Sequence, residues 1–247
     1  MNIKSYLDST YLKTSEDAGI SESENKDTTL KFIQEAIDEK FKLIMIRPEF
    51  VSIAKKMIID SKSKVTIGTV ISFPDGKNST DEKYLEAIQA INNGADDLDF
   101  VINYEAFKNG DIHLIKNEVL TCTRLGVENN KIVKWIIEVA ALNNDEIIKI
   151  CALIKNIVIA NFKEDNYANV FVKSSTGFFK TNNNTPNGAT IETLIVMLEN
   201  ASPLSIKASG GIKTTDDALQ MIRLGIKRIG TSSAKAIANN ESITSNY

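Results

Sequence analysis

The sequence predicts an α/β protein, a single (β/α)8 TIM barrel that occupies residues 1–247 as one domain. Short apolar segments, typical of strands buried on both faces, alternate with amphipathic segments typical of helices. Eight such pairs fit into the 247 residues, and this fold typically needs about 250. No linker or shift in composition divides the chain. A doubly wound open sheet is the alternative, but the glycine-rich dinucleotide motif is absent after the first strand.

The composition is that of a globular protein with a full core, since hydrophobic residues make up 43% of the chain and charged residues 25%. The net charge of −3 shows no excess of basic residues, which argues against a nucleic-acid partner. No run approaches the ~18 apolar residues of a membrane span, and the start lacks a signal-peptide pattern. We therefore expect a cytoplasmic protein with no membrane partner. One histidine and two distant cysteines, Cys122 and Cys151, offer no metal motif, so no metal site is expected.

In the first half of the chain each strand is followed by a helix with clear end signals. We expect strands at residues 6–10, 43–46, 65–72 and 97–103. We expect their helices at residues 27–40, from 48 onward, at 79–91 and, in broken form, at 104–125. Pro48 suits the first turn of a helix, where its missing N–H costs nothing. Ser79 and Glu82 have the spacing of a capping box, which marks the start of the third helix.

The second half of the chain repeats the pattern. We expect strands at residues 133–139, 170–176, 205–210 and 228–233. We expect their helices at about 143–156, 186–200 and 215–224. Residues from about 234 to 247 are expected to form a short helix and a flexible C-terminal tail.

Two of the expected strands each carry a lysine in the middle. The sequence FVKSSTG at 171–177 contains Lys173, and LSIKASGG at 204–211 contains Lys207. An ammonium group buried in an apolar strand is costly unless something compensates it. Burial also favours the neutral amine, which is a nucleophile. Because both strands also end in serine and glycine, this pair is the sharpest chemical signal in the sequence.

Strand periodicity gathers further charges on the faces that carry these lysines. Alternate residues of a barrel strand face inward. If Lys173 and Lys207 face inward, the matching face of the fourth strand contributes Asp99. The matching face of the fifth strand contributes Lys134 and Glu138. One interpretation is an ion-pair network that only stabilises the barrel, and the other is an active site, where shifted pKa values cluster.

These residues favour amine catalysis. A neutral lysine attacks a carbonyl carbon, forms a carbinolamine and then a Schiff base, and the Schiff base draws electrons from a nearby C–C bond. One lysine reacts, and the second lowers its pKa by like-charge repulsion, in addition to the effect of burial. A carboxylate within hydrogen-bond reach moves the protons. Asp99 is the first choice for that role and Asp8, in the first strand, is the second.

Three strand ends carry glycines beside hydroxyl residues, at 176–177, 209–211 and 230–233. Glycine lets backbone N–H groups approach an anion closely, and the N-terminus of a helix favours negative charge. In this fold the loops after the seventh and eighth strands commonly bind phosphate. Ordinary turn formation is the alternative for any one glycine, but the agreement of three strand ends favours a phosphate site.

Six motifs follow one another in a single collinear order between about residue 6 and residue 233. They are LDST at 7–10, ISFPDG at 71–76, GADDLDFVIN at 94–103, VKSSTG at 172–177, KASGGIKTTDDA at 207–218 and IGTSS at 229–233. With these motifs the chain resembles the deoxyribose-phosphate aldolases, which are class I (Schiff-base) aldolases on a (β/α)8 barrel. The resemblance implies reversible cleavage of a phosphosugar, 2-deoxy-D-ribose 5-phosphate, into D-glyceraldehyde 3-phosphate and acetaldehyde. It also implies no cofactor and a place in deoxyribose phosphate catabolism.

The resemblance assigns roles to individual residues. It implies that Lys173 forms the Schiff base, that Lys207 lowers its pKa and that Asp99 relays protons. Some members of the family end in a tyrosine that reaches the active site from a flexible tail, so the resemblance suggests the same role for Tyr247, with a disordered tail as the alternative. The expected substrate and phosphate contacts are Asp8, Thr10, Thr176, Gly177, Gly210, Gly211, Lys213, Gly230, Ser232 and Ser233.

Three positions depart from the pattern of the family. Met45 stands where a cysteine is frequent, so thiol chemistry linked to that position is not expected. Phe178 stands where a lysine is common, and Lys213 where an arginine is common. Because a lysine offers a point charge instead of a bidentate fork, we expect weaker binding of a 5-phosphate, with Lys180 as a candidate to compensate.

Two other functions stay open at this point. One is a Schiff-base aldolase or transaldolase that acts on a different phosphosugar. The other is a barrel that binds a phosphosugar without catalysis and whose charges are structural. The sequence leaves the oligomeric state open, and a homodimer is one arrangement it allows.

Overall fold

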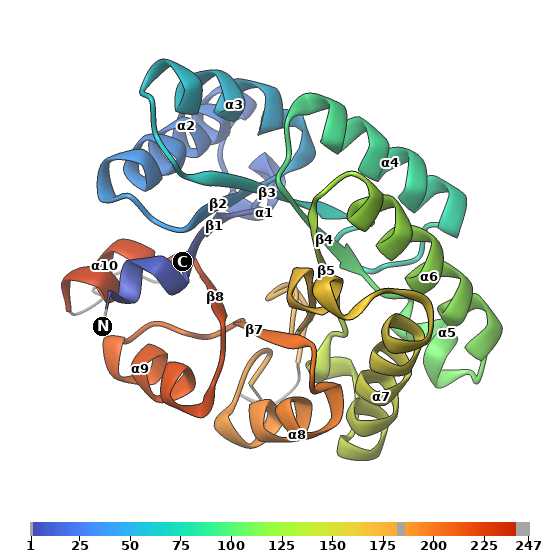
Figure 1. Ribbon diagram of the computed structural model, residues 1–247. Coiled ribbons are helices and arrows are strands. Elements are labelled where there is room, and N and C mark those ends of the chain that lie inside the picture. Colours follow the sequence, from blue (N-terminus) through green and yellow to red (C-terminus); the bar gives the residue numbers. More distant parts are fainter. Residues whose placement is uncertain (1, 182–185, 241–247) are drawn as a thin grey trace.

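Eight parallel strands close into a barrel in the order in which they occur in the chain (Figure 1). The computed structural model describes residues 2–181 and 186–240. The strands are β1 (Leu7–Tyr11), β2 (Leu43–Ile46), β3 (Thr66–Ile71), β4 (Asp97–Val101), β5 (Ile132–Ile136), β6 (Val170–Lys173), β7 (Ser205–Ser209) and β8 (Arg228–Thr231). The predicted fold class is confirmed.

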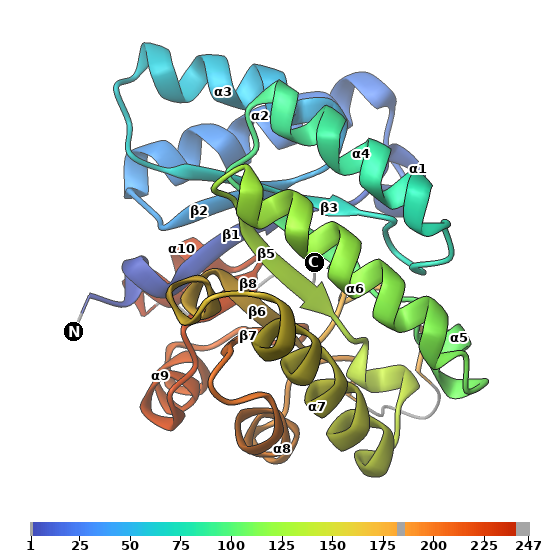
Figure 2. The ribbon, with the colours of Figure 1, turned by 45° about the vertical axis from the view of Figure 1, so that its right-hand side comes forward.

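Helices form a layer around the outside of the barrel, and α4, α6 and α7 lie next to one another along one side (Figure 2). The helices are α1 (Ser15–Ala18), α2 (Glu22–Glu39), α3 (Val51–Asp60), α4 (Thr80–Asn93), α5 (Tyr104–Lys108), α6 (Ile112–Glu128), α7 (Asn144–Asn161), α8 (Ile191–Ala201), α9 (Thr215–Leu224) and α10 (Ala234–Asn239). Shorter 3-10 turns occupy Ile3–Tyr6, Pro48–Phe50, Val139–Ala141 and Glu164–Asn169. The capping box at Ser79 and Glu82 forms as predicted.

Several predicted boundaries were wrong by a few residues. Helix α2, which was expected at residues 27–40, starts at Glu22, because Ser21 and Glu24 form a capping box that starts it earlier. The helix expected from residue 186 starts at Ile191, where Thr190 caps it. The fifth strand ends at Ile136 and not at 139, because Glu138 has a left-handed backbone with φ 55°.

The interior of the barrel has an apolar half and a charged half. Leu43 and Met45 of β2 and Val70 of β3 pack with Leu12 in a small buried cluster. The other strands bring their charged residues inward, as described below. A larger core lies between the strands and the surrounding helices, where Trp135 is fully buried. The charged side chains are therefore gathered in one half of the interior.

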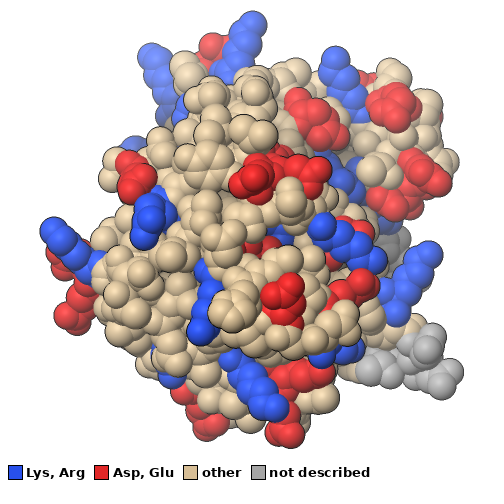
Figure 3. Space-filling model, turned by 90° about the vertical axis from the view of Figure 1, so that its right-hand side faces the viewer, with Lys and Arg blue, Asp and Glu red and all other residues tan. Residues whose placement is uncertain are grey.

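The outer surface over α4 to α7 mixes acidic and basic side chains and shows no broad region of a single sign (Figure 3). Within residues 2–181 and 186–240, no helix is both long and apolar enough to span a membrane. Cys122 and Cys151 are free and buried, and burial raises the pKa of each thiol to about 12.

Candidate active site

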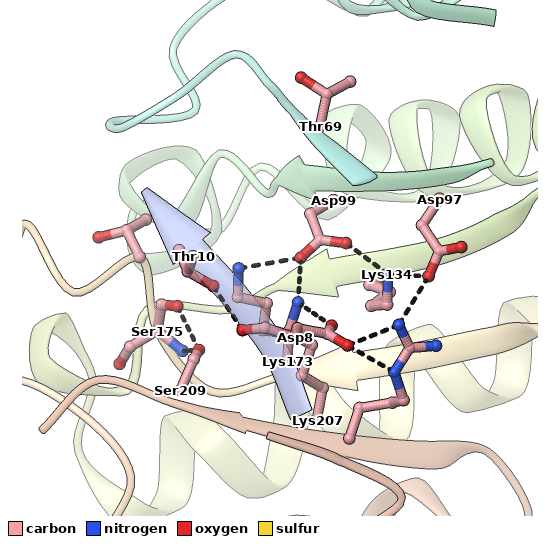
Figure 4. Close-up of polar contacts among 12 residues, drawn as sticks. Asp8, Thr10, Thr69, Asp97, Asp99, Lys134, Lys173, Ser175, Lys207 and Ser209 are labelled. Carbon is pink, nitrogen blue, oxygen red and sulfur yellow. Dashed lines mark hydrogen bonds and ion pairs between the residues drawn. The ribbon is translucent and has the colours of Figure 1, made fainter. Parts of the chain in front are cut away.

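The barrel interior holds a compact network of charged side chains that come from six of its strands (Figure 4). All of its members are at least nine-tenths buried. They are Asp8 of β1, Asp97 and Asp99 of β4, Lys134 of β5, Lys173 of β6, Lys207 of β7 and Arg228 of β8. The strand register places them together, because Lys173 lies opposite Lys207 and Asp99 lies opposite Lys134.

Asp99 lies at the centre of this network. Its Oδ2 accepts hydrogen bonds from Lys173 Nζ and Lys207 Nζ, each at 2.9 Å, and its Oδ1 accepts one from Lys134 Nζ at 2.7 Å. Burial acts to raise the pKa of Asp99, but the three ammonium groups hold it well below the usual range. The carboxylate is therefore ionised and in contact with both predicted lysines.

Lys173 has the properties of a nucleophilic amine. It is 2% exposed, and burial together with the charge of Lys207 lowers its pKa to about 8, although Asp99 acts in the opposite direction. About a tenth of such amines are neutral at pH 7, against less than a thousandth for an ordinary lysine. The neutral form is available where a carbonyl compound can reach it, because Lys173 lines a pocket.

Lys207 sits between two carboxylates. Its Nζ is 2.7 Å from Asp8 Oδ2 and 2.9 Å from Asp99 Oδ2, and it does not line the pocket. Its charge lies next to Lys173 without access to a ligand there. This position fits a residue that tunes a neighbour and does not react itself.

Arg228 and Asp97 complete the network and were not singled out from the sequence. Arg228 Nη2 is 2.6 Å from Asp8 Oδ1 and 3.3 Å from Asp97 Oδ2, and Lys134 Nζ is 2.7 Å from Asp97 Oδ2. Asp8 is thus fully buried among cations, and Arg228 and Lys207 lower its pKa although burial acts to raise it. Arg228 could have been found from the sequence, because it lies two residues before Gly230, a predicted site residue, and therefore on the same face of the strand.

The pocket has a volume of about 290 Å³ and opens at the carboxyl ends of the strands, where active sites of this fold lie. It brings together nine of the predicted residues: Thr10, Lys173, Thr176, Gly177, Gly210, Gly211, Lys213, Gly230 and Ser232. Four predicted residues lie elsewhere within the described chain: Asp8, Asp99, Lys207 and Ser233. Tyr247 lies outside the described residues. Additional lining residues are Leu12, Phe178, Asn187, Ser209, Ile212 and Thr231.

The backbone of the pocket is tightly packed at Gly210, which has a left-handed φ of 87°. A Cβ on Gly188 would lie 2.3 Å from the carbonyl oxygen of Gly210, so the loop after β6 can approach the end of β7 only without a side chain there. Gly188 was missed from the sequence, because this requirement depends on two loops meeting in space.

These observations agree with comparisons with known proteins. The model of the DeoC/LacD family aldolases matches residues 15–237. The chain belongs to the DeoC/LacD family of aldolases. It is therefore an aldolase, a lyase that makes or breaks carbon–carbon bonds.

The curated relatives cover nearly the whole chain. A deoxyribose-phosphate aldolase from Thermococcus gammatolerans is 36% identical over 238 residues, which cover 96% of this chain and 95% of the relative. One from Mycoplasmopsis pulmonis is 37% identical over 248 residues, with full coverage of both chains. Among solved structures, the tetrameric deoxyribose phosphate aldolase from Aeropyrum pernix matches with a TM-score of 0.74 and 25% identity, covering 96% of this chain and 89% of that one. The family resemblance seen in the sequence motifs is confirmed.

Glu138, which the strand periodicity placed with the interior lysines, lies just after the end of β5 on a left-handed backbone. It is buried, and the charge of Lys173 acts on its carboxyl group. Its Oε2 accepts hydrogen bonds from Thr176 N at 3.1 Å and from Thr176 Oγ1. Thr176 Oγ1 in turn accepts from Phe178 N at 3.0 Å. Glu138 thus fixes a hydroxyl that lines the pocket, and burial raises the pKa of its own carboxyl group.

The part of the chain that the structure describes contains no group of three or more histidine, cysteine, aspartate or glutamate side chains placed to hold a metal ion. Each of the three interior carboxylates is instead engaged by lysine or arginine. The arrangement that is present supports amine chemistry at Lys173 beside an ionised carboxylate.

Proposed function

We propose that this chain is a deoxyribose-phosphate aldolase, which reversibly cleaves 2-deoxy-D-ribose 5-phosphate into D-glyceraldehyde 3-phosphate and acetaldehyde. One observation carries the proposal: a buried lysine with a pKa of about 8 lines the pocket and donates a hydrogen bond to an ionised aspartate. The names of the full-length relatives supply the substrate.

The reaction begins when neutral Lys173 Nζ attacks C1 of the open-chain sugar. The carbinolamine loses water and leaves a protonated Schiff base. The C2–C3 bond then breaks, its electrons pass into the iminium group to form an enamine, and the C3 hydroxyl loses its proton and becomes the aldehyde of glyceraldehyde 3-phosphate. The enamine takes a proton at C2, and water hydrolyses the resulting imine to release acetaldehyde and the free amine.

Two neighbours support these steps. Asp99 is ionised and 2.9 Å from Lys173 Nζ, so it can take the proton that the amine loses on attack and return it to the leaving hydroxyl. Lys207 Nζ donates to the same carboxylate oxygen, and its charge favours the neutral form of Lys173. The glycine-bearing ends of β6, β7 and β8, with Lys213 and Ser232, are the proposed phosphate site.

Reductive trapping tests the proposal. The protein is treated with acetaldehyde and sodium borohydride, digested, and mapped by mass spectrometry. We expect one ethyl group on Lys173 in the unsubstituted chain and in the surface control Lys227→Met, and none in Lys173→Met. Labelling of another lysine would overturn the assignment of Lys173, and absence of any specific adduct would favour a barrel that only binds phosphosugars.

Product analysis separates this activity from that of another Schiff-base aldolase or a transaldolase. Incubation with 2-deoxy-D-ribose 5-phosphate should release acetaldehyde and glyceraldehyde 3-phosphate in equal amounts. Release of a ketose fragment from another phosphosugar at a higher rate would support the alternative enzyme.

We also propose that the protein works in the cytoplasm and forms a homo-oligomer. A homodimer is one arrangement that the sequence allows, and the Aeropyrum pernix structure is described as a tetramer. Light scattering on the purified chain distinguishes a monomer, a dimer and a tetramer by mass.

A further inference from the structure

A second cleft lies at the amino ends of the barrel strands, at the opposite end of the barrel from the pocket that Lys173 lines. It has a volume of about 550 Å³ and is formed by the segments that lead into β1, β2 and β3. A cleft of this size can hold a small organic molecule, since ligand sites usually measure about 300–1,000 Å³. It shares no lining residue with the pocket of the proposed reaction and is therefore a separate site.

The charged residues that line this cleft, among those the structure describes, are all lysines. They are Lys40 and Lys42, just before β2, and Lys62 and Lys64, just before β3. All four are exposed, and within residues 2–181 and 186–240 none of them forms an ion pair. Glu39, the acidic neighbour of Lys40, is engaged by Lys4 at 2.6 Å. The cleft therefore gathers positive charge that an anion can neutralise.

The two pairs of lysines come from two loops of the same structure. The loop after α2 closes with a hydrogen bond of 3.1 Å from Phe41 N to Ala36 O. The loop after α3 closes with one of 3.0 Å from Ser63 N to Ile58 O. Both bonds have the spacing of a Schellman motif, and each donor stands between two lysines. Because β2 and β3, which follow these loops, are paired neighbours, the lysines of both loops converge on one cleft.

Two of these lysines stand where the backbone favours another residue. Lys40 and Lys62 have left-handed backbones, with φ of 56° and 53°. This conformation is costly for a residue with a Cβ and suits glycine, which takes the position after α4 at Gly94. The dipole of a helix favours a cation at this end, but Lys42 and Lys64 lie beyond the helix ends. A role in holding an anion accounts for all four lysines.

The lining of the cleft also has an apolar part. Ile37, Phe41 and Val65 line it, and the last two are buried. We propose that the cleft binds an organic polyphosphate, a small molecule that carries two or more phosphate groups on an apolar or aromatic part. The phosphates contact the four lysines, and the apolar part lies on these three side chains. This binding is independent of the aldolase reaction.

Calorimetric titration with ATP in the presence of EDTA, at about 50 mM salt, tests the inference. The variant is Lys40→Gly with Lys62→Gly, because glycine suits the left-handed backbone and leaves the fold intact. The Kd for ATP should rise about tenfold or more, since two exposed ion pairs are lost. The Tm without ATP should stay within about 3 °C of that of the unsubstituted chain. Lys26→Gln with Lys31→Gln, on the exposed face of α2, removes the same charge as a matched control and should change the Kd less than about twofold.

An equal loss of affinity in the control would overturn the inference, as would absence of ATP binding to the unsubstituted chain. Binding that survives Lys40→Gly with Lys62→Gly but is lost in Lys213→Met would place ATP in the pocket of the proposed reaction and would also overturn it. Inorganic triphosphate should bind about tenfold or more weakly than ATP, because it lacks the apolar part. Equal affinity of the two would overturn the role of the apolar lining.

If the glycine variant does not fold, as judged by circular dichroism, Lys42→Gln with Lys64→Gln provides the same test. These two lysines lie outside the left-handed positions, and their loss should raise the Kd for ATP by about the same factor. An unchanged Kd in this variant would overturn the inference.

Discussion

Replacement of Lys207 by methionine removes one positive charge next to the proposed nucleophile. Lys173 and Lys207 both donate to Asp99 Oδ2 at 2.9 Å. Two donors on one oxygen lie about 5 Å apart, and at an effective dielectric constant of about 20 their repulsion is about 3 kcal/mol. That energy corresponds to about 2 pKa units. The pKa of Lys173 should therefore rise above about 8 in Lys207→Met, although burial, the largest cause of its lowering, still acts in the variant.

The consequence for the rate follows from the fraction of neutral amine. At pH 7 that fraction falls about 100-fold for a rise of 2 pKa units, and kcat/KM for deoxyribose phosphate cleavage should fall by about the same factor. The loss should be recovered as the pH rises, because deprotonation of Lys173 restores the nucleophile. The assay is the dependence of kcat/KM on pH between about pH 6 and pH 10, with glyceraldehyde 3-phosphate coupled to a reporter enzyme.

The direction of the pH dependence separates tuning from a merely structural role. If Lys207 only maintained the fold, the methionine variant would lose activity equally at every pH. A variant whose pH profile coincides with that of the unsubstituted chain would refute the two-lysine explanation. Lys227→Met, on the surface beside β8, serves as the matched control and should leave the profile unchanged.

Three further outcomes are expected. Lys83→Met leaves the fully buried carboxylate of Glu118 without its ammonium partner and should lower the free energy of unfolding by about 3–5 kcal/mol in urea; an unchanged midpoint would contradict this. Burial raises the pKa of Glu138, so its contribution to stability is present below the unfolded pKa and is lost as the pH rises through the folded one. Glu138→Gln should therefore gain stability relative to the unsubstituted chain in thermal unfolding as the pH rises above about 4, and a relative loss would reverse the assigned sign. Dialysis against a chelator should leave deoxyribose phosphate cleavage unchanged, and loss of activity that added metal restores would contradict amine catalysis alone.

The central lysines were predictable because a strand has a period of two. Lys173, Lys207 and Asp99 lie on inward faces that a simple count along each apolar segment identifies. Their partners were less predictable, since the contacts of Arg228 depend on the closure of β8 onto β1 and on the register of both strands.

The ends of the elements were harder to predict than their existence. The apolar sequence continues past Ile136, but the chain leaves the strand because Glu138 adopts a left-handed backbone that apolarity does not encode. The buried ion pair of Lys83 and Glu118 joins two helices, α4 and α6, whose packing supplies its surroundings. A sequence pattern within one helix marks such residues as polar and therefore as exposed.

The central claim is that Lys173 reacts as an amine with a lowered pKa. Its most direct test is the rate of ethyl transfer to Lys173 from acetaldehyde and cyanoborohydride as a function of pH, followed by peptide mapping of the unsubstituted chain. The structure predicts labelling at Lys173 with a midpoint near pH 8. A midpoint near the value of an ordinary lysine, about 10.4, or labelling at a different lysine, would contradict the claim.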